Sequence, residues 1–231
     1  MSNALACATC PVRDRAACAV LSETERDELA RSGRHRTLEP GEVLFRAGEK
    51  VDTCATLTRG ALKVTSTDQE GRERILALVH PAGFIGEFFQ PFDDHEVVAL
   101  AESEVCVFAG SDIERTMAEH PALARALLRR TQEDLHASRS LLALTGKPDA
   151  AAQVAGLIMG FAQAASDSPC HPARDFDLPL SRADIANMLG LTIETVSRKI
   201  TALEKSGAIR RNGKRGIELV DPARLAYLAE G

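Results

Sequence analysis

The chain has 231 residues, enough for two domains, and its 45% hydrophobic and 26% charged content is that of an ordinary globular protein. With no tryptophan and one tyrosine, it offers few aromatic platforms for stacking single-stranded bases, which argues against an RNA-binding protein. Its longest apolar runs are too short to span a bilayer and no secretion signal opens it, so we expect a cytoplasmic protein with no membrane partner.

Residues 1–21 are interpreted as a cysteine-bearing arm, because three of the six cysteines lie there. Cys7, Cys10 and Cys18 have the spacing Cys-x2-Cys-x7-Cys. In a reducing cytosol, clustered cysteines more often bind metal or act in redox chemistry than form structural disulfides. Four thiolates complete either a zinc site or an iron–sulfur cluster. The remaining cysteines compete to be the fourth ligand, and these are Cys54, Cys106 and Cys170.

Residues 22–120 are expected to form a sensor domain. A short helix through Ser32 precedes a region, residues 34–110, in which short β runs alternate with glycine-containing turns. The turn signals are Pro40-Gly41, Ala47-Gly48, Arg59-Gly60, Glu70-Gly71 and Ala82-Gly83. Regular strand-sized spacing of this kind favours an antiparallel barrel or jelly roll. The sequence Ser111-Asp-Ile-Glu114 then resembles a capping box that begins a helix.

Residues 121–146 are predicted to form one long helix, which begins at Pro121 and is ended by Gly146. Leucine recurs every seven residues along it, with small polar residues between, and the positions are Leu128, Thr131, Leu135, Ser138 and Leu142. A leucine in each heptad favours a seam between two helices and hence a homodimer. An amphipathic helix packed on its own barrel would explain the same periodicity equally well.

Residues 147–231 are expected to be a DNA-binding domain that begins with a helix near residues 149–165. Ser181-Arg-Ala-Asp184 resembles a capping box for a helix over residues 182–189, and Gly190 makes the following turn. Thr192 can cap a second helix that ends at Ser206. The apolar residues of this second helix are expected to pack inward at i, i+4 and i+7, and they are Val196, Ile200 and Leu203.

The opposite face of the second helix has the chemistry needed to read base edges. Glu194 can accept from cytosine N4, Arg198 can pair bidentately with guanine, and Ser197 can serve either base. Thr192 and Thr201 flank these residues and are expected to contact the DNA backbone.

A basic β wing is predicted after this helix, because Asn212-Gly213 is a strong hairpin signal. Its expected phosphate contacts are Arg210, Arg211, Lys214 and Arg215. The chain has a net charge of −5, yet residues 181–216 contain eight basic and three acidic residues and are therefore positive. The pattern predicts a winged helix-turn-helix that binds double-stranded DNA.

The whole chain resembles the FNR branch of the CRP/FNR transcription regulators. The reading motif Glu-x-x-Ser-Arg matches Glu194, Ser197 and Arg198, and the cysteine spacing resembles a sub-branch with a longer second gap. Cys54 and Cys106 both lie in apolar strand patterns that barely separate them, but the resemblance implies Cys106, in a short strand before the helices. It further implies an oxygen-labile 4Fe–4S cluster that promotes a homodimer, an inverted repeat similar to TTGAT, and RNA polymerase as a partner.

Other readings of the same residues remain open at this stage. The same thiolates suit zinc or a reversible thiol–disulfide switch. A cyclic nucleotide is not expected, because residues 75–114 contain no lysine or arginine to pair with its phosphate. An enzyme is not expected either, because Cys7 and Cys10 lack the strand-then-helix context of a Cys-x-x-Cys oxidoreductase. Arg13 and Arg15 could offset the negative charge of a thiolate cluster.

Overall fold

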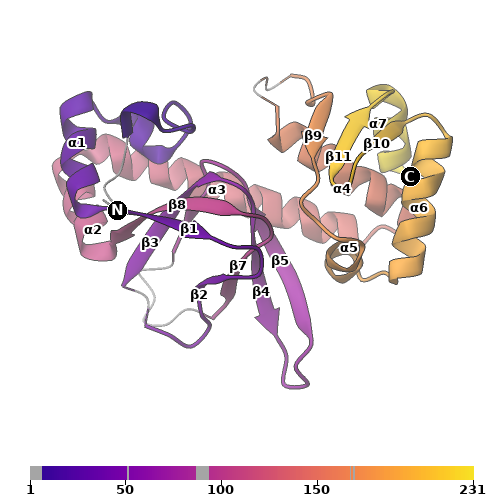
Figure 1. Cartoon of the computed structure of the whole chain (residues 1–231), viewed down its shortest axis with the longest axis horizontal. Coiled ribbons are helices and arrows are strands. Elements are labelled where there is room, and N and C mark those ends of the chain that lie inside the picture. Colours follow the sequence, from indigo (N-terminus) through magenta and orange to yellow (C-terminus); the bar gives the residue numbers. More distant parts are fainter. Residues whose placement is uncertain (1–6, 51, 87–93, 167, 169) are drawn as a thin grey trace. The chain divides into compact units, whose positions relative to one another are not determined.

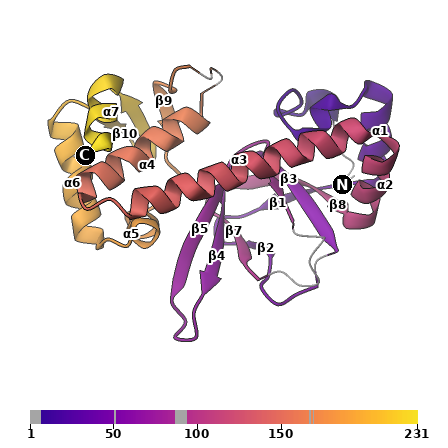
Figure 2. The ribbon, with the colours of Figure 1, turned by 180° about the vertical axis from the view of Figure 1, so that it is seen from behind.

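The structure is a computed structural model that describes residues 7–50, 52–86, 94–166, 168 and 170–231. The chain divides into two compact units, Met1–Ala137 and Ser138–Gly231, which are described separately (Figures 1 and 2). The first unit combines a β domain with helices, and the second is mainly helical with a small sheet. This α+β organisation agrees with the sequence prediction.

Two antiparallel four-stranded sheets form the β domain of the first unit, with strand orders β1-β8-β3-β6 and β2-β7-β4-β5. The strands of the first sheet are β1 (Arg34–Leu38), β3 (Thr53–Arg59), β6 (Phe84–Ile85) and β8 (Ser103–Ala109). The strands of the second sheet are β2 (Val43–Phe45), β4 (Leu62–Thr67), β5 (Glu73–Val79) and β7 (Glu96–Ala99). The order of strands in each sheet is not their order in the chain, as expected for a roll of two sheets.

Alternation along β8 divides its side chains between two apolar cores. Val105 and Val107 belong to a core of buried residues that also contains Leu57 and Leu62 from β3 and β4. Phe108 belongs to a second core, built with helical residues, and Cys106 packs against that core. Cys106 therefore faces the helix-covered side of its sheet.

The helices of the first unit lie near the outer face of the β1–β8–β3 sheet, as Figure 1 shows. They are the 3-10 turns η1 (Cys7–Thr9) and η2 (Ala17–Val20), and the α-helices α1 (Glu23–Ser32), α2 (Gly110–Glu119) and α3 (Pro121–Thr145). A complete capping box begins α1, in which Ser22 and Glu25 satisfy each other's backbone N–H groups. The helix α3 has the bounds that the sequence predicted.

The capping box expected at Ser111 is wrong. The helix α2 begins at Gly110 with Ala109 as its N-cap, two residues earlier than a box at Ser111 predicts, and no side chain caps it. The backbone N–H of Gly110 donates instead to the carbonyl oxygen of Asp52 at 2.8 Å. Because β8 runs directly into α2, a neighbouring backbone carbonyl satisfies the first N–H and no side-chain cap is needed there.

In its described residues, the second unit contains the C-terminal end of α3, four further helices and a three-stranded antiparallel sheet of order β10-β11-β9. Its elements are α4 (Ala150–Ala164), β9 (Asp175–Asp177), α5 (Arg182–Leu189), α6 (Ile193–Lys205), β10 (Ile209–Asn212), β11 (Gly216–Leu219) and α7 (Pro222–Glu230). The predicted capping box at Ser181 and Asp184 is present, and Gly190 has the left-handed φ of 66°. In the ranges that the structure describes, no helix is both long and apolar enough to cross a membrane.

Candidate metal-binding and DNA-binding sites

One cavity of about 220 Å³ in the first unit is lined by four cysteines from three separate segments. Cys7 lies in η1 with Cys10 directly after it, Cys18 lies in η2, and Cys106 lies in β8. The arm is held down by apolar contacts, because Val12 and Ala16 are buried and pack with Cys10 and Cys18 against the β domain. The fold therefore brings together the four residues predicted as metal ligands.

Cys7, Cys18 and Cys106 of this cavity are partly removed from water, which disfavours the ionised forms of their thiols. Burial raises the pKa of Cys7 and Cys18, an effect that the nearby Cys10 adds to and the guanidinium of Arg26 opposes. Burial, with smaller contributions from the other three cysteines, raises the pKa of Cys106 to about 12. The protonated thiols must lose their protons when a metal binds, so metal loading is expected to be favoured at higher pH.

The other two cysteines lie outside this cavity. Cys54 pairs with Phe108 in the β3–β8 register, two residue pairs beyond the pair of Thr56 with Cys106. Its side chain is fully buried, and its thiol donates to the carbonyl oxygen of Phe108 at 3.8 Å. Cys170 is exposed and belongs to the second unit. Cys54 therefore has a packing role, and the strand register separates it from Cys106 where the sequence pattern does not.

The four cysteine thiols line a cavity but do not converge on a single point within it. Among the described residues, no three Cys, His, Asp or Glu side chains converge tightly enough to hold a single metal ion. A set of four thiols has the chemistry to bind either an iron–sulfur cluster or a zinc ion.

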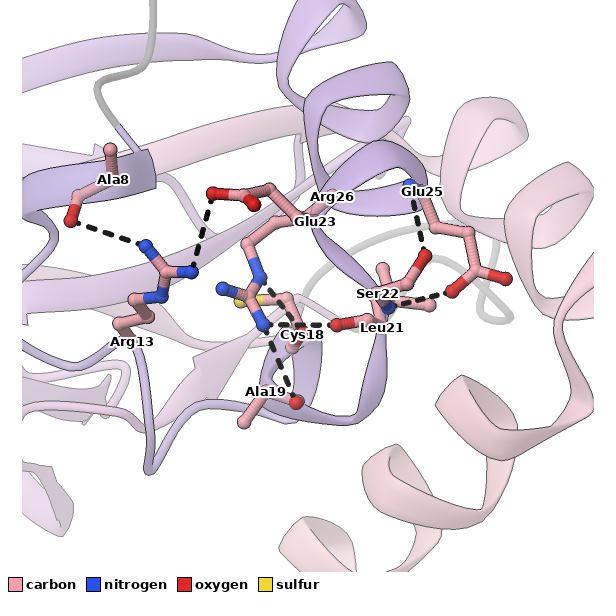
Figure 3. A network of polar contacts seen from close by, with 9 residues as sticks. All are labelled: Ala8, Arg13, Cys18, Ala19, Leu21, Ser22, Glu23, Glu25 and Arg26. Atoms are coloured by element: carbon pink, nitrogen blue, oxygen red, sulfur yellow. Dashed lines mark hydrogen bonds and ion pairs between the residues drawn. The ribbon is translucent and has the colours of Figure 1, made fainter.

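A buried arginine that the sequence reading missed also lines this cavity. Arg26 is 8% exposed and lies on α1, where a charged residue in a helix gives no signal in the sequence of being buried. The two arginines singled out from the sequence lie nearer the surface. Arg13 donates to the carbonyl oxygen of Ala8 at 3.3 Å and pairs with Glu23 at 3.7 Å (Figure 3).

The helix α6 presents the predicted base-reading face to solvent. Its N-cap Thr192 accepts a hydrogen bond from the backbone N–H of Thr195, and the inward residues Val196, Ile200 and Leu203 are buried. On the opposite face Glu194, Arg198 and Thr201 are exposed and Ser197 is half-buried. The face available to a duplex thus carries the groups that its predicted role requires.

The wing hairpin pairs Asn212 with Gly216, which leaves residues 213–215 as its loop. Gly213 has a φ of 66°, a left-handed conformation that favours glycine. Two of the predicted phosphate contacts are occupied by carboxylates, since Arg210 pairs with Glu218 at 2.7 Å and Arg211 pairs with Glu204 of α6 at 2.6 Å. The second pair ties the wing to the recognition helix, and Lys214 is exposed at the tip of the loop.

Substituting Lys214→Ala is expected to weaken binding to specific and scrambled duplexes by the same factor. A lysine at the wing tip can contact a phosphate but reads no base, so its removal should also reduce the slope of log Kd against log salt by about 1. Fluorescence anisotropy across a salt series measures both quantities. A loss confined to the specific duplex would contradict the phosphate role.

Three heptad leucines of α3 are left exposed by the described residues, although Leu123 and Leu127 of the same helix are buried. Leu128, Leu135 and Leu142 are 61%, 49% and 69% exposed, although they are large apolar side chains spaced by heptads. All residues from 131 to 140 are exposed, and the hydroxyl of Thr131 donates to the carbonyl oxygen of Leu127 at 3.1 Å. Leu128 and Leu135 therefore do not pack on the β domain of their own unit, and the seam between two helices that the heptad indicates stays a prediction.

Comparison with known proteins identifies the family. A model of the cyclic nucleotide-binding domain matches residues 35–120, and a model of the Crp-like helix-turn-helix domain matches residues 152–228. The transcriptional activator protein FnrL of Cereibacter sphaeroides is 32% identical over 222 residues, which cover 95% of this chain and 90% of the relative. The chain belongs to the CRP/FNR family of transcription regulators.

Other members of the family give the same picture. The nitrogen fixation regulation protein FixK of Bradyrhizobium diazoefficiens is 32% identical over 230 residues, covering 96% of this chain and 93% of FixK. The structure of FixK2 from Bradyrhizobium japonicum matches with a TM-score of 0.76 at 26% identity, covering 85% of this chain and 96% of that one. This CRP/FNR-family protein is accordingly a DNA-binding transcription regulator and not an enzyme.

Proposed function

We propose that this CRP/FNR-family regulator senses oxygen through a 4Fe–4S cluster bound by Cys7, Cys10, Cys18 and Cys106. It then binds an inverted repeat similar to TTGAT as a homodimer and contacts RNA polymerase. The observation that carries the proposal is the cavity of about 220 Å³ on which these four cysteines meet. The similarity to FnrL of Cereibacter sphaeroides and to the transcriptional activator Anr of Pseudomonas aeruginosa, 30% identical, supports placement in the FNR branch.

The cluster, when bound, supplies an oxygen-labile cross-link between the arm and the β domain. The residues of the chain do the rest. Val12 and Ala16 limit the access of water to the cysteines that they pack against. The exchange of thiol protons for metal, at groups whose pKa burial has raised, couples occupancy of the site to folding of the arm.

A hydrogen bond offers a route from the arm to the dimer helix. The side chain of Arg130 in α3 donates to the carbonyl oxygen of Arg15, which lies between Cys10 and Cys18. Arg130 also pairs with Glu133 at 2.8 Å, one turn along the same helix. Movement of the arm would therefore displace the side chain of Arg130, which is next in sequence to Thr131, one of the heptad positions proposed to form the seam. This arrangement supports a dimer whose stability depends on the state of the arm.

In the dimer, two copies of α6 would enter successive major grooves of a palindromic site. Glu194, Ser197 and Arg198 would read base edges, while Thr192, Thr201 and the basic residues of the wing would contact the backbone. In this proposal residues 1–21 are the cysteine-bearing arm, residues 22–120 the sensor domain, residues 121–146 the dimerisation helix and residues 147–231 the DNA-binding domain.

A zinc-bound or thiol–disulfide regulator of the same family is the second candidate, since the same cysteines suit both. A cyclic nucleotide is not part of the proposal, even though residues 35–120 match the model of that domain. The sequence from residue 75 to residue 114 has no lysine or arginine, so a cyclic phosphate would lack a cationic partner there.

Metal analysis of anaerobically purified protein tests the proposal. We expect iron and acid-labile sulfide near about four each per chain, with a visible absorbance that is lost in air together with the dimer and with binding to the inverted repeat. Size-exclusion chromatography and anisotropy before and after exposure to air measure the last two. Stoichiometric zinc, or binding that is indifferent to air, would overturn the oxygen-sensing function and leave the second candidate.

A further inference from the structure

The guanidinium of Arg26 is buried and only partly satisfied. Its Nε donates to the carbonyl oxygen of Cys18 at 3.3 Å, and its Nη2 donates to those of Ala19 at 3.4 Å and Leu21 at 3.0 Å. Its Nη1 has no hydrogen-bond partner although the side chain is 8% exposed. Figure 3 shows Nη1 on the side of the guanidinium away from these carbonyls.

An unpaired buried cation is rare, because desolvation of the charge must be offset by a partner. No carboxylate within the described part of the chain lies within ion-pair distance of Arg26. Three carbonyl oxygens accept the hydrogen bonds of Nε and Nη2, which explains why the side chain folds inward. Nη1 is buried as well, but it has no acceptor to offset its loss of hydration. Nη1 is therefore open to an anion that the described residues do not supply.

The position of Arg26 indicates where that anion would lie. Arg26 lines the same cavity as the four cysteines, and its charge acts on the thiols of both Cys7 and Cys18. A cluster bound by four thiolates carries net negative charge and hydrogen-bond-accepting sulfur atoms. A buried guanidinium with one free donor group complements that charge in a medium where electrostatic interactions are strong.

We propose that Arg26 is a positioning residue for the cysteine-bound cluster, with Nη1 donating to its anionic sulfur while Nε and Nη2 hold the segment from Cys18 to Leu21. This inference rests on the proposed function and deepens it. A guanidinium can do both because its donors form a planar fork, whereas the ammonium of a lysine cannot reach the carbonyls and the cavity in the same geometry. Arg13 also lines the cavity and acts on Cys7, but Arg26 is the buried arginine and acts on both Cys7 and Cys18.

The test compares Arg26→Met and Arg26→Lys with the matched control Arg31→Met, which removes an exposed arginine from the last turn of the same helix. Each full-length variant is loaded under argon, and the release of iron to a chelator is followed without oxygen. We expect release about 10-fold faster for Arg26→Met, a value typical of lost outer-shell partners, and an intermediate rate for Arg26→Lys. The control should match the wild type.

Thermal unfolding of the metal-free variants separates a structural role from a role toward the cluster. If Arg26 only holds the carbonyls, Arg26→Met and Arg26→Lys lower the Tm of the metal-free protein alike and release iron at the same rate, because the retained positive charge of lysine then makes no difference. That outcome would overturn the inference, as would equal release by all variants. If Arg26→Met does not fold, the rate for Arg26→Lys decides alone. The proposed function is judged separately, by whether the wild type binds iron and sulfide at all.

Discussion

Cys106→Ser is expected to lose the iron–sulfur cluster and, with it, anaerobic binding to the inverted repeat. The side chain of Cys106 lies on the helix-covered face of β8 and lines the cavity with the three arm cysteines, so its loss removes the ligand that would join the cluster to the β domain. A hydroxyl at neutral pH is a poor ligand for iron. Because a dimer binds two half-sites at once, loss of dimerisation should reduce affinity about 100-fold or more. Iron content and anaerobic anisotropy measure the two effects.

Two other cysteines provide the controls for this substitution. Cys170→Ser changes an exposed residue of the second unit and should leave iron content and DNA binding at wild-type values. Cys54→Ser keeps a donor for the carbonyl oxygen of Phe108 and should cost some stability without loss of iron. Loss of iron in Cys54→Ser together with its retention in Cys106→Ser would show that the fourth ligand has been assigned to the wrong strand.

The second large effect is expected from Arg198→Ala, which should weaken binding to the specific duplex by about 1–3 kcal/mol, or about 5- to 150-fold. Arg198 is exposed on the outer face of α6, two residues beyond the buried Val196 that anchors the helix. Its guanidinium can make two hydrogen bonds to one guanine, so its removal should relax the preference for that base pair. Affinity for a scrambled duplex should change much less.

A panel of duplexes with each base pair substituted in turn measures this loss of discrimination. Lys205→Ala is a suitable control, since Lys205 is a basic residue in the last turn of the same helix. An equal loss on specific and scrambled DNA for Arg198→Ala would mean that Arg198 contacts a phosphate instead of a base.

The DNA-binding end of the protein could be read almost completely from its sequence. The capping box at Ser181, the cap at Thr192, Gly190 and the turn at Asn212-Gly213 are local signals, and each acts through the backbone of its own segment. The face of α6 followed from helical periodicity, which Val196, Ile200 and Leu203 obey. The pairing of Arg211 with Glu204 could not be predicted from the sequence, because a contact between a wing and a helix depends on how the two elements pack.

At the N-terminal, cysteine-bearing end of the protein, less of the site could be predicted from the sequence and more depended on the tertiary structure. The sequence by itself determined that the arm carries three cysteines, that a β domain follows and that a heptad of leucines marks α3, since spacing and periodicity are local properties. Only the tertiary structure decided that Cys106 rather than Cys54 lines the cavity, and that Arg26 is buried there with a free donor. Both facts depend on strand register and on helices packing over one sheet. These are long-range contacts, and no local pattern in the chain encodes them.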